Sequence, residues 1–340
     1  MDEDSDRDFG GYITFDSAGL ERPGPFDPAD EGGPPKLFAL GRHCLEAVCR
    51  AARPGRLFLP TFTCESVKKV AARLGMDVRY YSISESFVPQ VDALRQGDLL
   101  VLNNYFGLSA GSAPVAAWLR EAGPRSCVID DTQSIGMRNQ FPGHASFLSP
   151  RKFLPLTDGG ILFDPDGTVA EADMPQRRDM SWNRVEWLVR AIDERGRDPS
   201  YAAYADFRKG LQDLEYMRMS AVTQSLLAVI DIGAAIRSRN INFNRLRTAL
   251  PIAPCFDWQE PRRQTSAPIG YPVFVADARD AQRRLSKHRI YATRYWPDLD
   301  TDTSTNSFEE TLLRHLLIIP INVAASDAQL SALEAIVNRG

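Results

Sequence analysis

The chain has 340 residues, of which 44% are hydrophobic and 25% are charged, and its formal net charge is -4 at pH 7. This length and composition are typical of a globular protein with one large and one smaller domain, and the net charge argues against binding nucleic acid through a basic surface. No apolar run reaches membrane-spanning length and the first residues, MDEDSDRDF, are acidic, so we expect a soluble cytoplasmic protein that spans no membrane.

The first part of the chain, residues 1–36, is rich in Asp, Gly and Pro and shows little periodicity, which predicts an irregular N-terminal arm. From Leu37 the pattern becomes helical, and strand and helix patterns then alternate. The predicted strands are 56–60, 77–81, 99–106, 127–130, 145–148 and 160–163, with helices at 66–74 and 113–122. This alternation predicts an α/β fold with a mostly parallel central sheet and helices on both faces.

The pattern changes after Pro165. Residues 180–250 are mainly helical, and from about residue 267 a smaller α/β unit follows, which ends in a helix from Asp327. We therefore predict a large α/β domain at 37–250, including the helical bridge, and a small C-terminal α/β domain at 251–340.

The cysteines and histidines show no pattern of metal ligands. Five cysteines lack C-x-x-C spacing, and the four histidines lack metal-ligand spacing. An odd number of such cysteines indicates reduced thiols and argues against a disulfide framework or a zinc site. The P-loop, GxGxxG, GxSxG and HExxH motifs are also absent from the sequence, which disfavours the enzyme classes that use them. We predict no metal site.

Lys152 is a lone lysine among bulky apolar residues, with Phe147 and Leu148 before it and Phe153 and Leu154 after it. Desolvation in such a setting lowers the pKa of a lysine and makes its neutral amine available to attack a carbonyl, including that of pyridoxal phosphate. The alternative is a structural lysine whose stem packs while its ammonium group reaches water. This stretch alone leaves both interpretations open.

Two further segments carry polar groups where ligands bind in α/β proteins. Gly41 and Arg42 begin a helical pattern, and backbone N–H groups at a helix N-terminus bind phosphate. Asp130 ends a buried strand and Gln133 follows it, at the sheet edge where ligands of open α/β sheets lie. Ser149 adds a hydroxyl close to Lys152. The structural alternatives are an ordinary helix start and a carboxylate that caps a turn.

Five segments occur in the order found in one enzyme family. Gly41–Leu45 looks like a Gly-Thr-x-Ala-Leu phosphate loop, Pro60–Thr63 like Pro-Ser-x-Thr, Tyr105–Gly107 like Tyr-x-Gly, Asp130–Gln133 like Asp-Ala-Ala-Gln, and Lys152 with Asp158–Gly160 like a Schiff-base lysine before Glu-Gly-Gly. Leu317–Asn322 is similar to a sixth motif, Leu-x-Ile-Pro-Val-Asp. The chain thus resembles the fold-type I pyridoxal-phosphate (PLP) enzymes, and among them the DegT/DnrJ/EryC1/StrS sugar aminotransferases, as a divergent member.

The resemblance implies a role for each matched residue. Lys152 would form the Schiff base with pyridoxal 5'-phosphate and act as general base and acid, while Asp130 would keep the pyridine nitrogen protonated. Gln133 would orient the ring, and Gly41, Arg42 and Ser149 would bind the phosphate. The implied set of cofactor-binding residues is Gly41, Arg42, His43, Thr63, Cys64, Tyr105, Asp130, Gln133, Ser149 and Lys152.

Two positions depart from the family pattern. Arg42 stands where the family has Thr or Ser, so that a guanidinium would hold part of the phosphate. Cys64 stands where an aromatic side chain stacks on the cofactor ring in the family. Either Phe62 or Tyr105 takes over the stacking, or the ring is held differently.

The resemblance implies a PLP-dependent aminotransferase that uses a small-molecule amino donor and a keto acceptor, such as a nucleotide sugar or another small substrate. It also implies a homodimer, in which the partner subunit contributes an Asn; Asn240 and Asn244 are the candidates. Arg294 would meet a substrate carboxylate or pair with an acidic neighbour.

Two alternatives to aminotransfer stay open. One is another PLP reaction, namely elimination, dehydration or carbon–carbon bond chemistry. Lys152 argues against the dehydratase branch, whose members carry histidine at that position. The other is a degenerate, non-catalytic fold-type I scaffold, which Cys64 at the stacking position motivates.

Overall fold

The computed structural model describes residues 34–92, 94–193, 197–256, 265–299 and 307–338. The predicted N-terminal arm therefore lies, up to residue 33, outside the described residues.

One large sheet forms the centre of the molecule, with its strands in the order β1-β9-β8-β6-β5-β2-β3-β4. The run β8-β6-β5-β2-β3 is parallel, whereas β9, β1 and β4 each pair antiparallel to their neighbours. The strands are β1 Lys36–Phe38, β2 Arg56–Pro60, β3 Val78–Ile83, β4 Pro89–Gln90, β5 Asp98–Asn103, β6 Cys127–Asp130, β8 Ala145–Leu148 and β9 Gly160–Phe163. The predicted mostly parallel α/β sheet is confirmed.

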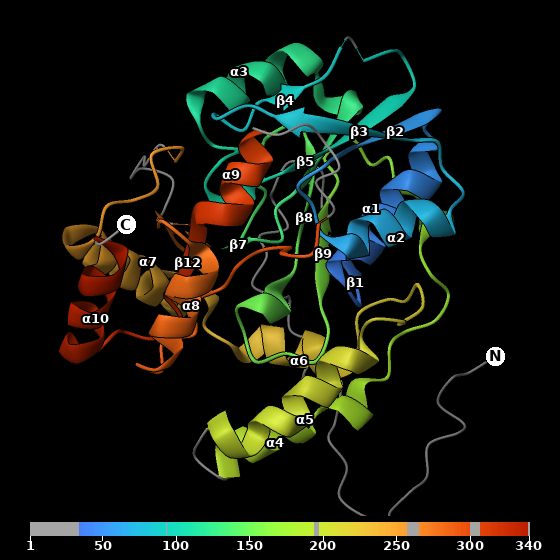
Figure 1. The fold of residues 1–340 in the computed structure, drawn as a ribbon. Helices are drawn as coiled ribbons and strands as arrows, with labels where there is room; N and C mark the ends of the chain where they lie inside the picture. The colour runs from blue at the N-terminus through green and yellow to red at the C-terminus, as the bar shows by residue number, and fades with distance from the viewer. Residues whose placement is uncertain (1–33, 93, 194–196, 257–264, 300–306, 339–340) are drawn as a thin grey trace, which may run out of the picture.

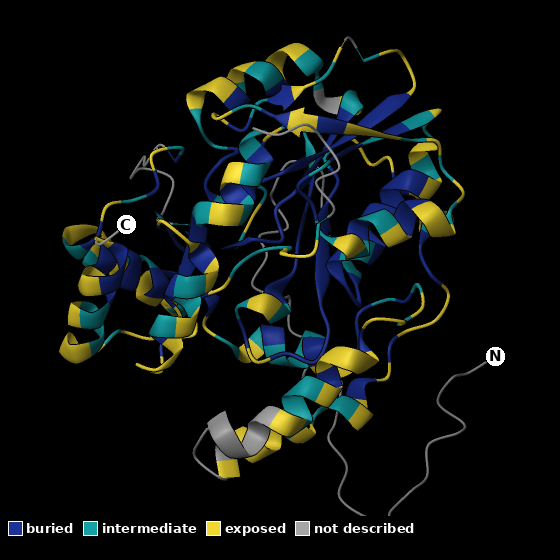
Figure 2. Ribbon diagram, in the orientation of Figure 1, coloured by how far each residue is buried: buried dark blue, intermediate teal, exposed yellow. Residues whose placement is uncertain are grey.

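Helices cover both faces of this sheet because its buried strands carry apolar side chains on both sides. Leu57 and Val101 belong to the core that contains α1 (Gly41–Ala52) and α2 (Glu65–Arg73). Leu100 belongs to the opposite core, with α3 (Ala113–Ala122) and the C-terminal helices. In Figure 1, α1 and α2 lie to the right of the sheet and α7, α8 and α10 to the left, and Figure 2 shows the strands between them as buried.

The predicted helical stretch at 180–250 contains α4 Glu186–Asp193, α5 Arg197–Gly210, α6 Ala221–Val229 and α7 Ile232–Ala249. Ser220 and Asp231 start α6 and α7 by accepting hydrogen bonds from backbone N–H groups of their first turns. Within the described ranges no single helix is long and apolar enough to cross a membrane. Taken together, α6 and α7 would meet that test by length and composition, but they are bent by 69° relative to each other.

The C-terminal part contains a two-stranded antiparallel sheet of β11 (Gly270–Phe274) and β12 (Leu316–Pro320). Three helices pack with it: α8 Ala278–Ser286, α9 Phe308–His315 and α10 Asp327–Val337. Their apolar side chains share one core with the α3 side of the large sheet. The domain boundaries at 36 and 250 stay predictions.

Local departures from the predicted pattern are found. The predicted strand 99–106 ends at Asn103, and Tyr105–Gly107 forms a 3₁₀ turn. Lys36–Phe38, where the sequence predicts a helix from Leu37, is the edge strand β1, and the helix begins at Gly41. The reason is pairing with a distant strand, since β1 is antiparallel to β9 with Leu37 opposite Ile161. The sequence also gave no sign of β7 (Ser134–Gly136), which pairs with β10 (Ser266–Pro268).

Candidate active site

A cavity of about 450 Å³ opens where β6 and β8 end and α1 begins. This is the carboxyl edge of the parallel strands, where open α/β sheets bind ligands. It receives residues from the large sheet, from the segment around α5 and from the C-terminal part. Its lining residues are Leu40, Gly41, Arg42, Cys64, Ser66, Val67, Asp130, Thr132, Gln133, Phe147, Ser149, Arg151, Lys152, Arg208, Leu211, Gln212, Thr293, Arg294, Tyr295 and Trp296.

Lys152 ends a short 3₁₀ turn, Pro150–Lys152, that directly follows β8. Its Nζ donates a hydrogen bond of 2.8 Å to Thr132 Oγ1. The side chain has exposed surface and lines the cavity, but the surrounding protein atoms replace much of its hydration. This burial lowers the pKa of Lys152, and the negative charge of Asp130 opposes the shift in part. The environment therefore favours the neutral, nucleophilic amine relative to a lysine in water.

Asp130 and Gln133 are held by the backbone of the turn after β6 and by a neighbouring loop. Asp130 Oδ1 accepts a hydrogen bond of 3.0 Å from the Thr132 N–H. Gln133 Oε1 accepts one of 2.8 Å from the Phe106 N–H, which fixes the amide so that its nitrogen is the end left to donate. The predicted turn-capping role of Asp130 is thus present, and it coexists with a place in the cavity wall.

Asp131, the neighbour of Asp130, is buried outside the cavity lining. Its Oδ1 accepts hydrogen bonds from Asn104 Nδ2 at 2.7 Å and from Ser134 Oγ at 2.5 Å. Burial raises the pKa of Asp131 to about 7, although both hydrogen bonds act in the other direction. This side chain anchors the turn that carries Asp130, Thr132 and Gln133.

We expect Asp131→Asn to stabilise the protein above pH 7 and to change little at about pH 4. The pKa of this carboxyl group is 3.8 in the unfolded protein and about 7 in the folded protein. Between these pH values only the folded state keeps the proton. The wild type therefore loses stability as the pH rises through this window, whereas the amide has no such proton to release. Urea unfolding of both proteins at several pH values measures the effect. A stability difference that does not change with pH would contradict it.

The N-terminus of α1 faces the same cavity through Gly41 and Arg42. A side chain at position 41 would meet Thr132 Cγ2 at 2.9 Å and Ser149 Cβ at 3.5 Å, so glycine lets the helix start close to both residues. The first turn of α1 contains no acidic residue and Leu40 provides no side-chain cap. The partial positive charge of the helix start is thus available to an anion.

The segment Asp158–Gly160 packs against the start of α1. Asp158 accepts hydrogen bonds of 2.7 Å from the Ser220 N–H and from Ser220 Oγ, and a further one from Thr223 Oγ1, so it fixes α6. Gly160 lies directly under Leu40 and Gly41, at distances that leave no room for a Cβ atom. The Asp-Gly-Gly motif therefore has a structural role in this chain.

Arg42 bonds to the segment after α5. Its Nη2 donates hydrogen bonds to the carbonyl oxygens of Leu211 at 2.6 Å, Gln212 at 3.1 Å and Leu214 at 3.2 Å. Burial lowers the pKa of Arg42 to about 10, and the nearby guanidinium groups of Arg73 and Arg151 add to this. The guanidinium predicted to bind phosphate thus has carbonyl partners and ties α1 to this segment.

Seven of the ten predicted cofactor-binding residues line this cavity, and three do not. The cavity lining contains Gly41, Arg42, Cys64, Asp130, Gln133, Ser149 and Lys152. His43, Thr63 and Tyr105 are buried and are absent from that lining. His43 lies on the side of α1 that packs on Tyr216, Thr63 Oγ1 accepts a hydrogen bond from Asn103, and Tyr105 donates one to the Phe62 carbonyl.

His43 and Phe62 lie outside the cavity because both pack in the protein core. Burial lowers the pKa of His43 to about 3, so it is a neutral core histidine whose Nε2 lies 3.3 Å from the Leu214 carbonyl oxygen. Phe62, one of the two candidates for ring stacking, is also buried outside the lining and packs against Trp296. The aromatic side chains that do line the cavity are Phe147, Tyr295 and Trp296.

Sequence reasoning missed several lining residues. Thr132 could have been identified from the sequence, because its hydroxyl stands where the similar family motif has alanine. Arg208, Tyr295 and Trp296 were not predicted because no local pattern marks them. Of the other candidates, Arg294 lines the cavity, Asn240 donates to the Ser266 carbonyl at 3.0 Å, and Asn244 is exposed on α7. A contribution of either Asn to a partner's site stays a prediction.

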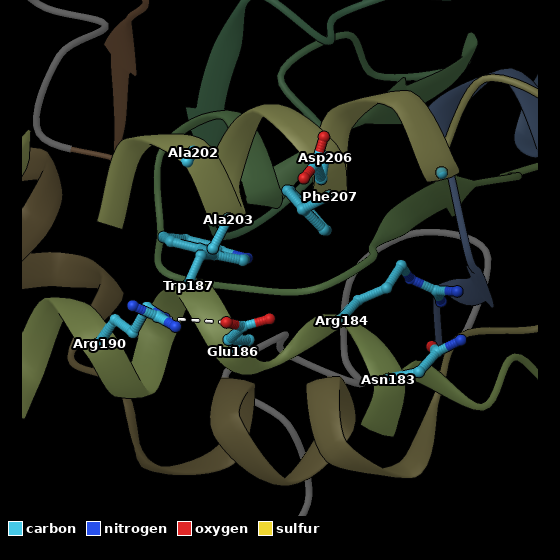
Figure 3. A pocket seen from close by; sticks show the side chains of 10 residues that line it. Asn183, Arg184, Glu186, Trp187, Arg190, Ala202, Ala203, Asp206 and Phe207 are labelled. Carbon is cyan, nitrogen blue, oxygen red and sulfur yellow. Dashed lines mark hydrogen bonds and ion pairs between the residues drawn. The ribbon is translucent and has the colours of Figure 1, made fainter. Parts of the chain in front are cut away.

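A second cavity of about 460 Å³ lies between α4 and α5 (Figure 3). Trp187 from α4 and Asp206 and Phe207 from α5 line it, together with Arg184. In this cavity Arg190 pairs with Glu186, and neither Lys152 nor Asp130 reaches it. The reactive groups are therefore in the first cavity.

No protein-family model and no curated protein sequence matches the chain. Solved structures do match. A DegT DnrJ EryC1 StrS aminotransferase from Brucella abortus is 14% identical with a TM-score of 0.58, over 90% of this chain and 85% of that chain. The sugar aminotransferase CalS13 from Micromonospora echinospora is 14% identical with a TM-score of 0.59, over 90% and 87%. A 3-amino-5-hydroxybenzoic acid synthase is 15% identical with a TM-score of 0.54, over 90% and 85%. At this identity the likeness establishes the fold, that of the fold-type I aminotransferases.

Proposed function

We propose that this chain, which has the fold of the DegT/DnrJ/EryC1/StrS aminotransferases, is a PLP-dependent aminotransferase. One observation carries the proposal: Lys152, with a lowered pKa, lines one cavity together with Asp130 and the N-terminus of α1. A nucleophilic amine, a carboxylate and a phosphate-binding helix start are the three groups that PLP needs from a protein.

The cavity residues fit this cofactor. The uncapped start of α1 at Gly41 and the Ser149 hydroxyl would take the phosphate, and Asp130 would pair with the ring nitrogen. Gln133, fixed through its Oε1, would donate its amide N–H to the ring oxygen. Tyr295 or Trp296 would cover the ring in place of the aromatic residue that Cys64 replaces. When bound, PLP supplies an electron sink for the substrate carbon.

Lys152 would act twice in the reaction. Its neutral amine would hold the cofactor covalently. As a free amine, Nζ would accept and donate a proton as general base and acid. The hydrogen bond to Thr132 Oγ1 holds Nζ near the turn that carries Asp130. Thr132 would thus position the amine between these steps.

The substrate is proposed from the neighbours' chemistry. A sugar aminotransferase and a 3-amino-5-hydroxybenzoic acid synthase share this fold, so a nucleotide sugar or another small keto compound is the proposed amino acceptor. The homodimer that the sequence resemblance implies, and the cytoplasmic location expected from the cysteine pattern and the acidic first residues, are likewise proposed. The competing proposal is a non-catalytic scaffold. It rests on Cys64, which lines the cavity at the position where the family has a stacking aromatic residue.

The test is amino-group exchange on the purified protein. Addition of PLP should give an absorption band of lysine-bound cofactor, an amino acid donor should bleach it, and a keto acid should restore it. Mass spectrometry of the products from a pool of donors then separates aminotransfer from elimination or carbon–carbon bond chemistry. A protein that binds PLP but is bleached by no amino acid would support the scaffold.

A further inference from the structure

Arg151 and Arg208 are two guanidinium groups in the cavity wall for which no ion pair with a carboxylate is found in the described part of the chain. Arg151 Nε is buried and makes no hydrogen bond. Among the described residues, no hydrogen bond or ion pair to a carboxylate is found for Arg208 either, and its side chain is exposed. Burial of the Arg151 guanidinium without a partner is costly, and the like charge of Arg208 adds repulsion, unless an anion joins the two groups.

The two arginines lie at the end of the cavity that α1 faces. Arg151 stands in the turn between Ser149 and Lys152, and Arg208 stands near the end of α5. Arg42 binds the carbonyls of residues 211, 212 and 214, which brings the segment after α5 to the start of α1. Burial lowers the pKa of Arg151 and the charge of Arg208 adds to this, while Tyr204 and Asp158 oppose the shift in part. The charge of Arg151 in turn lowers the pKa of Arg42.

The cavity has a strong excess of positive charge. Its described lining residues include four arginines, Arg42, Arg151, Arg208 and Arg294, and one carboxylate, Asp130. Asp130 acts on Lys152. Asp158 acts on Arg151, but its oxygens accept hydrogen bonds from Ser220 and Thr223. The planar fork of a guanidinium matches phosphate oxygens and binds them with charge-assisted hydrogen bonds.

We propose that Arg151 and Arg208 form a phosphate-binding pair that, with the start of α1 and Ser149, holds the 5'-phosphate of the cofactor within one chain. This inference rests on the proposed function. The same chemistry would suit a phosphate group of the substrate, which the experiment below distinguishes from that of the cofactor.

Helix α5 provides a matched control for this test. Arg208 lines the cofactor cavity, whereas Asp206 and Phe207 line the separate cavity of Figure 3. Lys209, the next residue, pairs with Asp206 at 3.2 Å and is outside the cofactor cavity. Arg208→Gln and Lys209→Gln therefore remove one positive charge each from adjacent positions, but only the first removes it from the cavity.

The experiment measures dissociation constants of PLP and of pyridoxal, which lacks the phosphate, by absorbance titration of the full chain. We expect Arg208→Gln to weaken PLP binding about tenfold to a hundredfold and to leave pyridoxal binding unchanged, since a hydrogen bond to a charged group is involved. Lys209→Gln should change neither. Arg151→Lys, which keeps the charge but loses the fork, should weaken PLP binding to a smaller extent. Circular dichroism checks that each variant is folded.

Equal PLP affinity of wild type and Arg208→Gln, both folded, would overturn the inference. Binding of inorganic phosphate to the PLP-loaded wild type, lost in Arg208→Gln, would also overturn it, because the pair would then serve a substrate phosphate. Failure of the wild type to bind either PLP or pyridoxal would instead refute the proposed function. The two failures are thus distinguishable.

Discussion

Lys152→Ala is expected to abolish covalent binding of the cofactor and turnover together. The side chain supplies the only lysine amine among the described residues of the cavity lining. Burial lowers its pKa, which raises the share of the nucleophilic form relative to a lysine in water. Loss of its proton transfer alone is worth about 10²–10⁴-fold in rate. Alanine also removes the donor to Thr132 Oγ1 but leaves the phosphate end of the cavity intact. We therefore expect the variant to bind PLP without the absorption band of lysine-bound cofactor.

The measurement has two parts: absorption spectra with added PLP, and borohydride reduction followed by peptide mass spectrometry. Reduction should add the mass of the cofactor to the peptide that contains Lys152 in the wild type and to no peptide in Lys152→Ala. Lys69→Ala is the control, because Lys69 is exposed on α2 and outside the cavity. It should behave as the wild type. Aminotransfer that survives in Lys152→Ala would refute the proposed role of this lysine.

Gly160→Ala is expected to destabilise the protein and to weaken cofactor binding. A Cβ atom at this position would lie 2.3 Å from the Leu40 carbonyl oxygen, 2.4 Å from the Leu40 carbonyl carbon and 2.8 Å from the Gly41 backbone nitrogen. All three are backbone atoms, so no side chain can rotate away and β9 must separate from the start of α1. Overpacking of this kind costs about 1–3 kcal/mol and occasionally more. The shift also moves the N-terminus of α1, which faces the cavity.

Urea unfolding measures the stability of Gly160→Ala, and PLP titration measures its affinity. Gly210→Ala is the control: it ends α5, its Cβ would meet nothing within 4 Å, and its φ is not in the left-handed region. Alanine there should be neutral or slightly stabilising, because glycine has the greater freedom in the unfolded chain. An unfolding midpoint of Gly160→Ala equal to that of the wild type would contradict the steric argument.

The sequence by itself was sufficient for the fold class and for the centre of the candidate site. The predicted strand 127–130 and the first part of the predicted strand 99–106 are buried parallel strands, as their apolar composition predicts. Asp130, Gln133 and Lys152 line one cavity because each lies within a few residues of the carboxyl end of a parallel strand, and those ends share one edge of the sheet. Chain order and strand ends are local information, which a sequence pattern contains.

Only the tertiary structure decided which remaining residues reach the cavity. His43 and Lys36–Phe38 took positions set by contacts with Leu214 and β9, which no local period encodes. Arg208 and Trp296 come to the cavity from segments 56 and 144 residues beyond Lys152 in the sequence, and their place depends on how α5 and the C-terminal part pack on the sheet. Packing over such separations is decided by the complementarity of whole surfaces, and not by the propensity of any one segment.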